Sequence, residues 1–119
     1  MSKLSLNFVR SEFECGCGCG FDVVDAELIK LLENIRFHFN AIVNVSSGAR
    51  CEAYNESVGG SKNSQHLLGK AADITLVGVA PDSVAEYVAF SHPNTYGLGR
   101  YNTFTHVDVR DNKARWGKR

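Results

Sequence analysis

The chain has 119 residues, of which 44% are hydrophobic and only two are proline, so residues 1–119 have room for one globular domain with a single core. Its 13 Lys and Arg residues balance its 13 Asp and Glu residues. A neutral chain lacks the positive field by which proteins hold nucleic acid or anionic membranes, so we expect neither partner and expect a monomer.

The start of the chain lacks the apolar core of a secretory signal, and no stretch approaches the roughly 20 apolar residues of a membrane span. We therefore expect synthesis in the cytoplasm without a signal peptide, and no membrane span. A substrate outside the membrane would be reached only after release of the protein.

Cysteine usage is the unusual feature of the composition. Cys15, Cys17 and Cys19 alternate with glycine, whereas Cys51 stands alone. Tetrahedral zinc sites usually space their thiolates by two to four residues. The tighter spacing of these cysteines therefore favours free thiols over a structural metal site. A disulfide to Cys51, a structural metal and a thiol-based redox function stay open as alternatives.

Two segments have the apolar spacing of amphipathic helices. Residues 25–39 begin with Asp25, a good N-cap residue, and carry Leu28, Leu32 and Ile35 on one face. Residues 81–90 begin with a proline, which the first turn of a helix tolerates. Each apolar stripe needs a sheet to cover.

Three segments rich in Val, Ile or Thr are expected strands: residues 41–46, 71–77 and 104–109. A shorter strand over residues 96–101 would precede the last of these. Together with the helices they predict the α+β class, with a small, mostly antiparallel sheet that carries helices on one face and a site on the other.

Two polar stretches remain. Residues 47–70 separate the first two strands, and a loop this long in so small a domain is usually functional or disordered. Near the other end of the chain a solvated basic tail is expected, with the cations Lys113, Arg115, Lys118 and Arg119.

Three candidate metal ligands come from the end of the 47–70 loop and from two strands. Side chains alternate along a strand, so Asp73 points away from the apolar core, and His106 and Asp108 share one face of the last strand. His66, at the end of the loop, can therefore converge with Asp73 and His106. Two histidines and one carboxylate leave the fourth zinc position for water, as in catalytic zinc sites.

The same segment resembles the signature of a known family, the zinc D-alanyl-D-alanine carboxypeptidases. Every fixed position of Ser-x-His-x-x-Gly-x-Ala-x-Asp is filled, by Ser64, His66, Gly69, Ala71 and Asp73. Residues 47–50 are similar to the family's Ser-Gly-Tyr-Arg element, and residues 105–108 to its C-terminal histidine strand. The family includes vancomycin-resistance D-Ala-D-Ala dipeptidases and phage L-alanyl-D-glutamate endopeptidases, and the hedgehog signalling domain shares its fold.

The resemblance implies that His66, Asp73 and His106 bind Zn²⁺ and that the substrate is a peptidoglycan stem peptide. It also implies that Arg50 grips the substrate carboxylate or the developing oxyanion, a role suited to its planar, permanently charged fork. Ser64 is expected to hydrogen-bond near a ligand or the substrate.

The chain departs from the family at the general base. Many relatives carry Glu or Asp three residues before the last histidine ligand, where this chain has Thr103, and another branch carries histidine where it has Phe104. The nearest carboxylate on the same strand face is Asp108, which we expect either to shuttle the proton or to orient a ligand.

These features predict a zinc-dependent murein peptidase that trims a terminal D-Ala or cuts within the stem peptide. Its expected setting is cell-wall lysis by a bacteriophage or prophage, after release or from the virion. The alternative is a non-catalytic binding module of the same fold, in which zinc only stabilises the domain.

Overall fold

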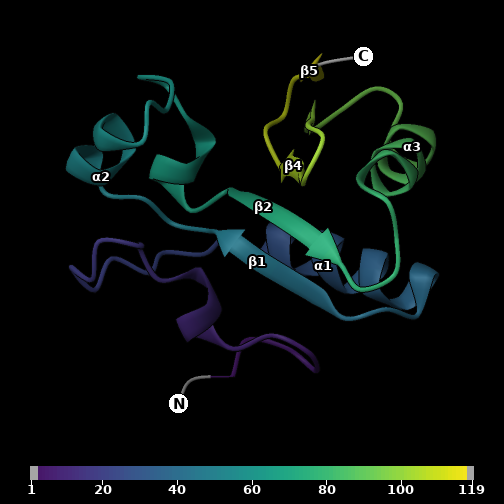
Figure 1. Ribbon diagram of the computed structural model, residues 1–119, viewed down its shortest axis with the longest axis horizontal. Coiled ribbons are helices and arrows are strands. Elements are labelled where there is room, and N and C mark those ends of the chain that lie inside the picture. The colour runs from purple at the N-terminus through teal and green to yellow at the C-terminus, as the bar shows by residue number, and fades with distance from the viewer. Residues whose placement is uncertain (1–2, 118–119) are drawn as a thin grey trace.

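The computed structural model describes residues 3–117, which form one sheet with helices on both sides (Figure 1). The elements follow one another along the chain as η1 (Arg10–Phe13), α1 (Ala26–Phe39), β1 (Val43–Ser47), α2 (Glu52–Ser57), η2 (Gln65–Leu68), β2 (Ala71–Leu76), α3 (Pro81–Ser91), β3 (Gly97–Arg100), β4 (Thr105–Asp108) and β5 (Ala114–Gly117).

The five strands lie in the order β1-β2-β4-β3-β5. All neighbouring pairs are antiparallel except β3 and β5, which run parallel. In the central pair Asp73 lies directly opposite His106, and Ala71 lies opposite Asp108. The prediction of an α+β fold with a mostly antiparallel sheet is confirmed, and this register brings two predicted site residues together.

Helix α1 forms where the amphipathic pattern predicts it. The Asp25 carboxylate accepts a hydrogen bond from the Glu27 N–H at 2.8 Å, which caps the start, and Asn40 ends the helix in the left-handed region at φ 49°. The turn at Asn40 delays the first strand, which begins at Val43 instead of residue 41.

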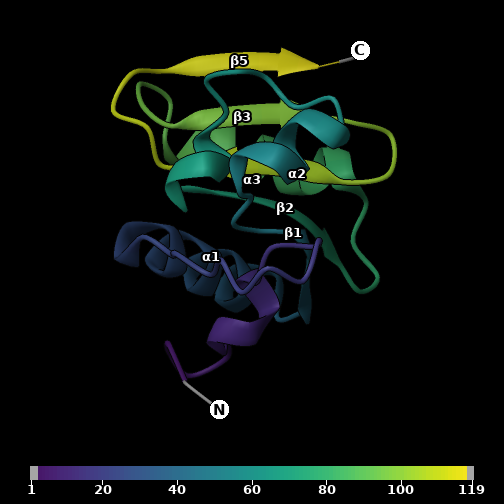
Figure 2. The ribbon, with the colours of Figure 1, turned by 90° about the vertical axis from the view of Figure 1, so that its left-hand side faces the viewer.

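The core lies between the sheet, α1 and α3. Its largest fully buried aliphatic side chains come from both helices and three strands: Leu28, Leu32, Ile35, Ile74, Val84, Val88, Leu98 and Val107. Figure 2, which views the sheet from the side of α2, shows α2 in front and α3 behind. The apolar layer therefore leaves the face near α2 for polar side chains.

Two sequence predictions need correction. The stretch 47–70 is not a plain loop, because it contains α2 and η2, which are too short to show helical periodicity. The prediction of a solvated basic tail is also wrong, because residues 114–117 form β5. Its Arg115 side chain donates hydrogen bonds to the carbonyls of His92 and Tyr96, each at 2.7 Å. Lys118 and Arg119 lie outside the described residues.

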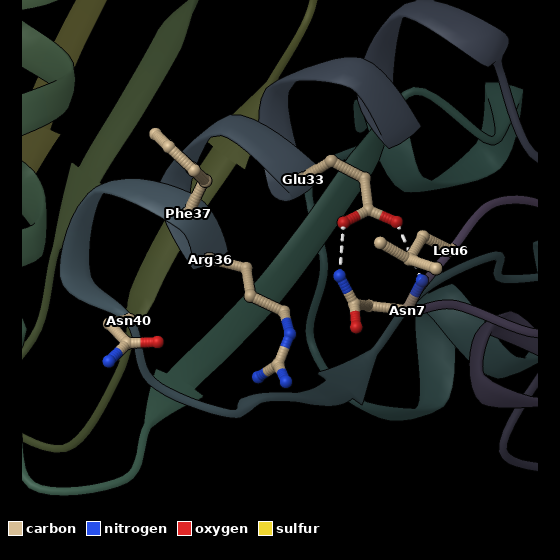
Figure 3. Close-up of a pocket in the computed structure, with 6 residues that line it drawn as sticks. All are labelled: Leu6, Asn7, Glu33, Arg36, Phe37 and Asn40. Carbon is tan, nitrogen blue, oxygen red and sulfur yellow. Dashed lines mark hydrogen bonds between the residues drawn. The ribbon is translucent and has the colours of Figure 1, made fainter.

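The N-terminal segment is held to α1 by a carboxylate. Glu33 accepts hydrogen bonds from the Asn7 backbone N–H at 2.8 Å and from its side-chain amide at 2.7 Å, and a third from the Ser5 hydroxyl. Figure 3 shows Glu33 facing Asn7 beside a shallow hollow. Burial raises the pKa of Glu33, but these hydrogen bonds outweigh it and the net pKa is lowered.

Within residues 3–117 no helix has the length and apolar character to cross a membrane.

Candidate metal centre

The three predicted ligands meet at the polar face of the sheet. His66 comes from η2, Asp73 from β2 and His106 from β4, and one donor atom from each lies within 4.8 Å of the others. Their exposed fractions are 2%, 7% and 8%, so the donors are largely shielded from bulk water. Buried polar groups of this kind need partners, and the partners found here determine which atoms face one another.

His66 is fixed by a short capped turn. The Ser64 hydroxyl accepts a hydrogen bond from the His66 backbone N–H at 3.1 Å, and Gly69 ends the turn at φ 70°. The His66 Nδ1 lies 2.7 Å from the Gly48 carbonyl, which can only accept, so Nδ1 carries the proton. The lone pair of Nε2 therefore points towards Asp73, whose Oδ1 is 3.3 Å away.

Gly69 has a second reason to be glycine. A side chain there would place its Cβ 2.4 Å from the Val23 carbonyl oxygen, which approaches this turn closely. The Gly69 carbonyl in turn accepts a hydrogen bond from the Asp25 N–H at 2.8 Å. The glycine of the signature thus lets the turn that carries His66 pack against the start of α1.

His106 lies between two carboxylates. Its Nδ1 is 2.9 Å from Asp73 Oδ1, and its Nε2 is 2.8 Å from Asp108 Oδ2. Burial lowers the pKa of His106, but the hydrogen bonds to Asp108 and Asp73 outweigh it and the net pKa is raised. A histidine that binds a metal through one nitrogen usually donates its other N–H to a carboxylate or carbonyl. Both imidazoles are arranged in this way.

Asp108 is completely buried and both of its oxygens have partners. Arg110 donates from Nε to Oδ1 and from Nη2 to Oδ2, each at 2.8 Å, and its backbone N–H bonds Oδ1 at 3.2 Å. Burial raises the pKa of Asp108, but Arg110 and His106 outweigh it and hold the pKa well below its usual range. Sequence reasoning missed Arg110, although two-residue alternation after Asp108 could have placed it on the same face.

Arg50 is held beside the same centre by three acceptors. Its Nε donates to the Ser47 hydroxyl at 3.0 Å, one Nη to the Asn55 side-chain oxygen at 3.0 Å, and the other to Asp73 Oδ2 at 3.3 Å. Asn55 is only 4% exposed, and its amide donates to the Ser61 carbonyl at 2.8 Å. Because α2 was not foreseen from the sequence, this support from Asn55 was not predicted.

Above these residues lies an open cleft with an aromatic wall. The Trp116 ring centroid is 5.0 Å from that of His106, and its indole N–H donates to the Tyr101 hydroxyl at 2.9 Å. Tyr101 stacks on Phe104, with ring centroids 4.4 Å apart. Among the described residues that line the cleft, Asp73 is the only carboxylate, and Thr103 is not part of the lining.

The donor set fits a zinc ion. Two imidazole nitrogens whose ring partners are already hydrogen-bonded face one carboxylate oxygen, which matches the two-histidine, one-carboxylate set of catalytic zinc sites. Burial raises the pKa of Asp73, but the close His106 and His66 imidazoles outweigh it and lower the pKa well below its usual range. The carboxylate is therefore anionic at neutral pH, as a metal ligand must be.

The comparison with known protein families found a match that covers most of the chain. The sequence profile of the family described as Peptidase M15 matches residues 6–108, a range that includes every predicted site residue. No curated protein matches the chain. Members of this family are zinc-dependent peptidases, so a hydrolase acting on peptides fits the cleft. Because the match covers most of the sequence, the chain belongs to the Peptidase M15 family.

Proposed function

We propose that this protein is a zinc-dependent murein peptidase that hydrolyses peptide bonds of peptidoglycan stem peptides. The observation that carries the proposal is the convergence of His66, Asp73 and His106 at the base of an open cleft, with Arg50 bonded to the same carboxylate. A zinc ion bound there supplies Lewis acidity, which lowers the pKa of water and polarises a carbonyl group.

Arg50 is the proposed substrate-binding residue. A guanidinium has five N–H groups, and three of them have partners among the described residues. The remaining two are available for a carboxylate or an oxyanion in the cleft, where charge-assisted hydrogen bonds are strong. Ser64 acts through His66, because its hydroxyl caps the turn that presents that imidazole.

Asp108 is proposed as a positioning residue and not as the proton shuttle. Its two oxygens are occupied by His106 and Arg110, and the side chain has no exposed surface. A carboxylate in that state fixes the orientation of His106, and it is not in contact with the cleft. The described cleft offers no other carboxylate in place of the family's acid at position 103, so turnover is expected to be slow.

The lack of a cleft carboxylate beyond Asp73 also favours a second candidate function. In this alternative the same centre holds zinc, and the domain binds a wall peptide or a protein without cleaving it. The cleft, Arg50 and the aromatic wall would serve binding equally well, so the two functions differ only in turnover.

The deciding experiment is the release of new amino groups and of D-Ala from purified peptidoglycan, with products identified by mass. Zinc-loaded wild type is compared with His66→Ala and with His38→Ala, which changes an exposed histidine that does not line the cleft. We expect cleavage by the wild type and by His38→Ala, and none by His66→Ala. Intact peptidoglycan with zinc bound in the wild type would favour the binding module.

The same products identify the bond. Free D-Ala would indicate a carboxypeptidase, whereas a new D-Glu amino terminus would indicate an L-Ala-D-Glu endopeptidase. We further propose that the setting is lysis of a host cell wall by a phage or prophage, and this part of the proposal rests on the family resemblance alone.

A further inference from the structure

All four cysteines gather at one place in the fold, away from the sheet ligands. Cys15, Cys17 and Cys19 come from the loop after η1, and Cys51 is the N-cap residue of α2. Their sulfur atoms all lie within 4.8 Å of one another. The separation is 3.5 Å between Cys15 and Cys17, 3.8 Å between Cys15 and Cys51, and 3.7 Å between Cys17 and Cys51.

The loop conformation explains how so tight a spacing brings three thiols together. In an extended chain, alternate residues would share a face but stand too far apart along the strand. Here the Cys15 N–H donates to the Phe21 carbonyl at 2.8 Å, and the Gly18 N–H donates to the Cys15 carbonyl at 3.1 Å. Gly18 and Gly20 adopt φ 83° and φ 92°, which side chains rarely allow. The glycines thus curl the loop around its own sulfur atoms.

The sulfur separations match a shared metal ion. Four thiolates bound at about 2.3 Å to a tetrahedral zinc lie about 3.8 Å from one another, whereas a covalent disulfide requires about 2.0 Å. Two backbone N–H groups also point at sulfur, from Cys51 to Cys15 Sγ and from Tyr54 to Cys51 Sγ, each at 3.4 Å. Donors of this kind stabilise the negative charge of metal-bound thiolates.

We propose that Cys15, Cys17, Cys19 and Cys51 bind a second zinc ion in a closed tetrahedral site. Each thiol gives its proton to the solvent as its sulfur bonds Zn²⁺ from solution, and no oxidation takes place. A site with four protein ligands keeps no open position, so its role is structural. This inference goes beyond the proposed peptidase activity and does not depend on it.

The position of Cys51 gives this ion a function in the fold. Cys51 follows Arg50, whose backbone N–H donates to the His66 carbonyl at 3.0 Å. The ion would tie the cysteine loop to the start of α2, and α2 carries Asn55, which holds the Arg50 side chain. The second ion therefore fixes one wall of the cleft without contacting a substrate.

The test is the zinc content of the purified full chain, measured by elemental analysis after removal of loosely bound metal. We expect two zinc ions per wild-type chain, one in Cys51→Ser, one in Cys19→Ser, and one in His66→Ala. Glu14→Gln, which changes an exposed neighbour of Cys15, is the matched control and should retain both ions.

Replacement of zinc by cobalt tests for sulfur ligands in the wild type itself, so the main result does not depend on a variant that could fail to fold. Co²⁺ bound by four thiolates gives intense sulfur-to-metal charge-transfer absorption, and nitrogen and oxygen ligands do not. We expect this absorption in wild type and in His66→Ala, and its loss in Cys51→Ser.

Any of three results would overturn the proposal. The first is one zinc per wild-type chain with no change on cysteine substitution. The second is a disulfide found by mass analysis of protein purified without oxidant. The third is iron in place of zinc, since four thiolates also suit iron–sulfur chemistry.

Discussion

Two groups of candidate metal ligands can be compared: the sheet centre, which consists of His66, Asp73 and His106, and the cysteine cluster, which consists of the four cysteines. They differ in donor atoms, in exposure and in the number of ligands. The sheet centre uses nitrogen and oxygen donors from β2, β4 and η2. Its three side chains are buried, and they lie at the base of an open cleft. The cysteine cluster uses four sulfur donors from a curled loop and a helix start, with Cys17 and Cys19 exposed. One chain thus combines a three-ligand site suited to catalysis with a four-ligand site suited to holding the fold.

The largest expected effect separates the two centres outright. Asp73 contributes a ligand oxygen, lies 2.9 Å and 3.3 Å from the two imidazoles and accepts a hydrogen bond from Arg50, so Asp73→Ala should eliminate zinc at the sheet centre and all peptide hydrolysis. The ion of the cysteine cluster should remain. Zinc content and peptidoglycan cleavage measured on the same sample check this, and loss of both ions would show that the centres depend on each other.

Arg50→Lys should reduce kcat/KM by about 10²–10³-fold, the usual effect of removing one charge-stabilising donor. Lysine keeps the positive charge but loses the planar fork that bonds Ser47, Asn55 and Asp73. Zinc content should stay at the wild-type value, which makes it the internal control. Unchanged kinetics with a model stem peptide would contradict the role given to Arg50.

Asp108→Asn should weaken zinc binding at the sheet centre by about 10–100-fold, as is typical when a partner of a ligating histidine is replaced. The measurement is competition with a chelator, read separately from the cysteine-bound ion. If Asp108 shuttled the proton instead, zinc affinity would be unchanged and the acidic limb of the pH–rate profile would move.

A pH effect follows from the same carboxylate. The folded-state pKa of Asp108 is held below its unfolded value near 4, so it contributes stability above about pH 4 and loses it as pH falls through the folded value. Metal-free wild type should therefore lose stability below about pH 4, and metal-free Asp108→Asn should lose less over the same interval. Urea unfolding at a series of pH values measures both, and identical slopes would exclude Asp108 as the cause.

The smallest effect is expected far from both centres. Glu33→Gln should cost about 1 kcal/mol of unfolding free energy, because the amide keeps only part of the hydrogen bonding to Asn7 and Ser5 (Figure 3). Zinc content and turnover should not change. A loss of either would mean that the N-terminal segment positions the metal ligands.

Periodicity and residue chemistry predict the helices α1 and α3, most strands and the metal ligands of this molecule. They do not predict its short turns and short helices. Strand alternation placed Asp73 and His106 on one face, and the register of β2 and β4 sets them opposite each other. Neither α2 nor η2 is long enough to show a period, so the support that Asn55 gives Arg50 was not foreseen. Spacing rules also assume an ordinary backbone, and the positive φ values at Gly18 and Gly20 are not visible in a motif.

Strand β5 has a practical consequence for anyone who shortens this protein. The family match ends at residue 108, yet Trp116 and Arg115 follow it. A version trimmed to the matched range would lose Trp116 from the aromatic wall of the cleft. It would also leave the backbone of β3 unpaired along one edge, since β5 covers it in parallel register. Exposed strand edges invite other chains to pair, so the trimmed protein should aggregate, although every predicted ligand would still be present.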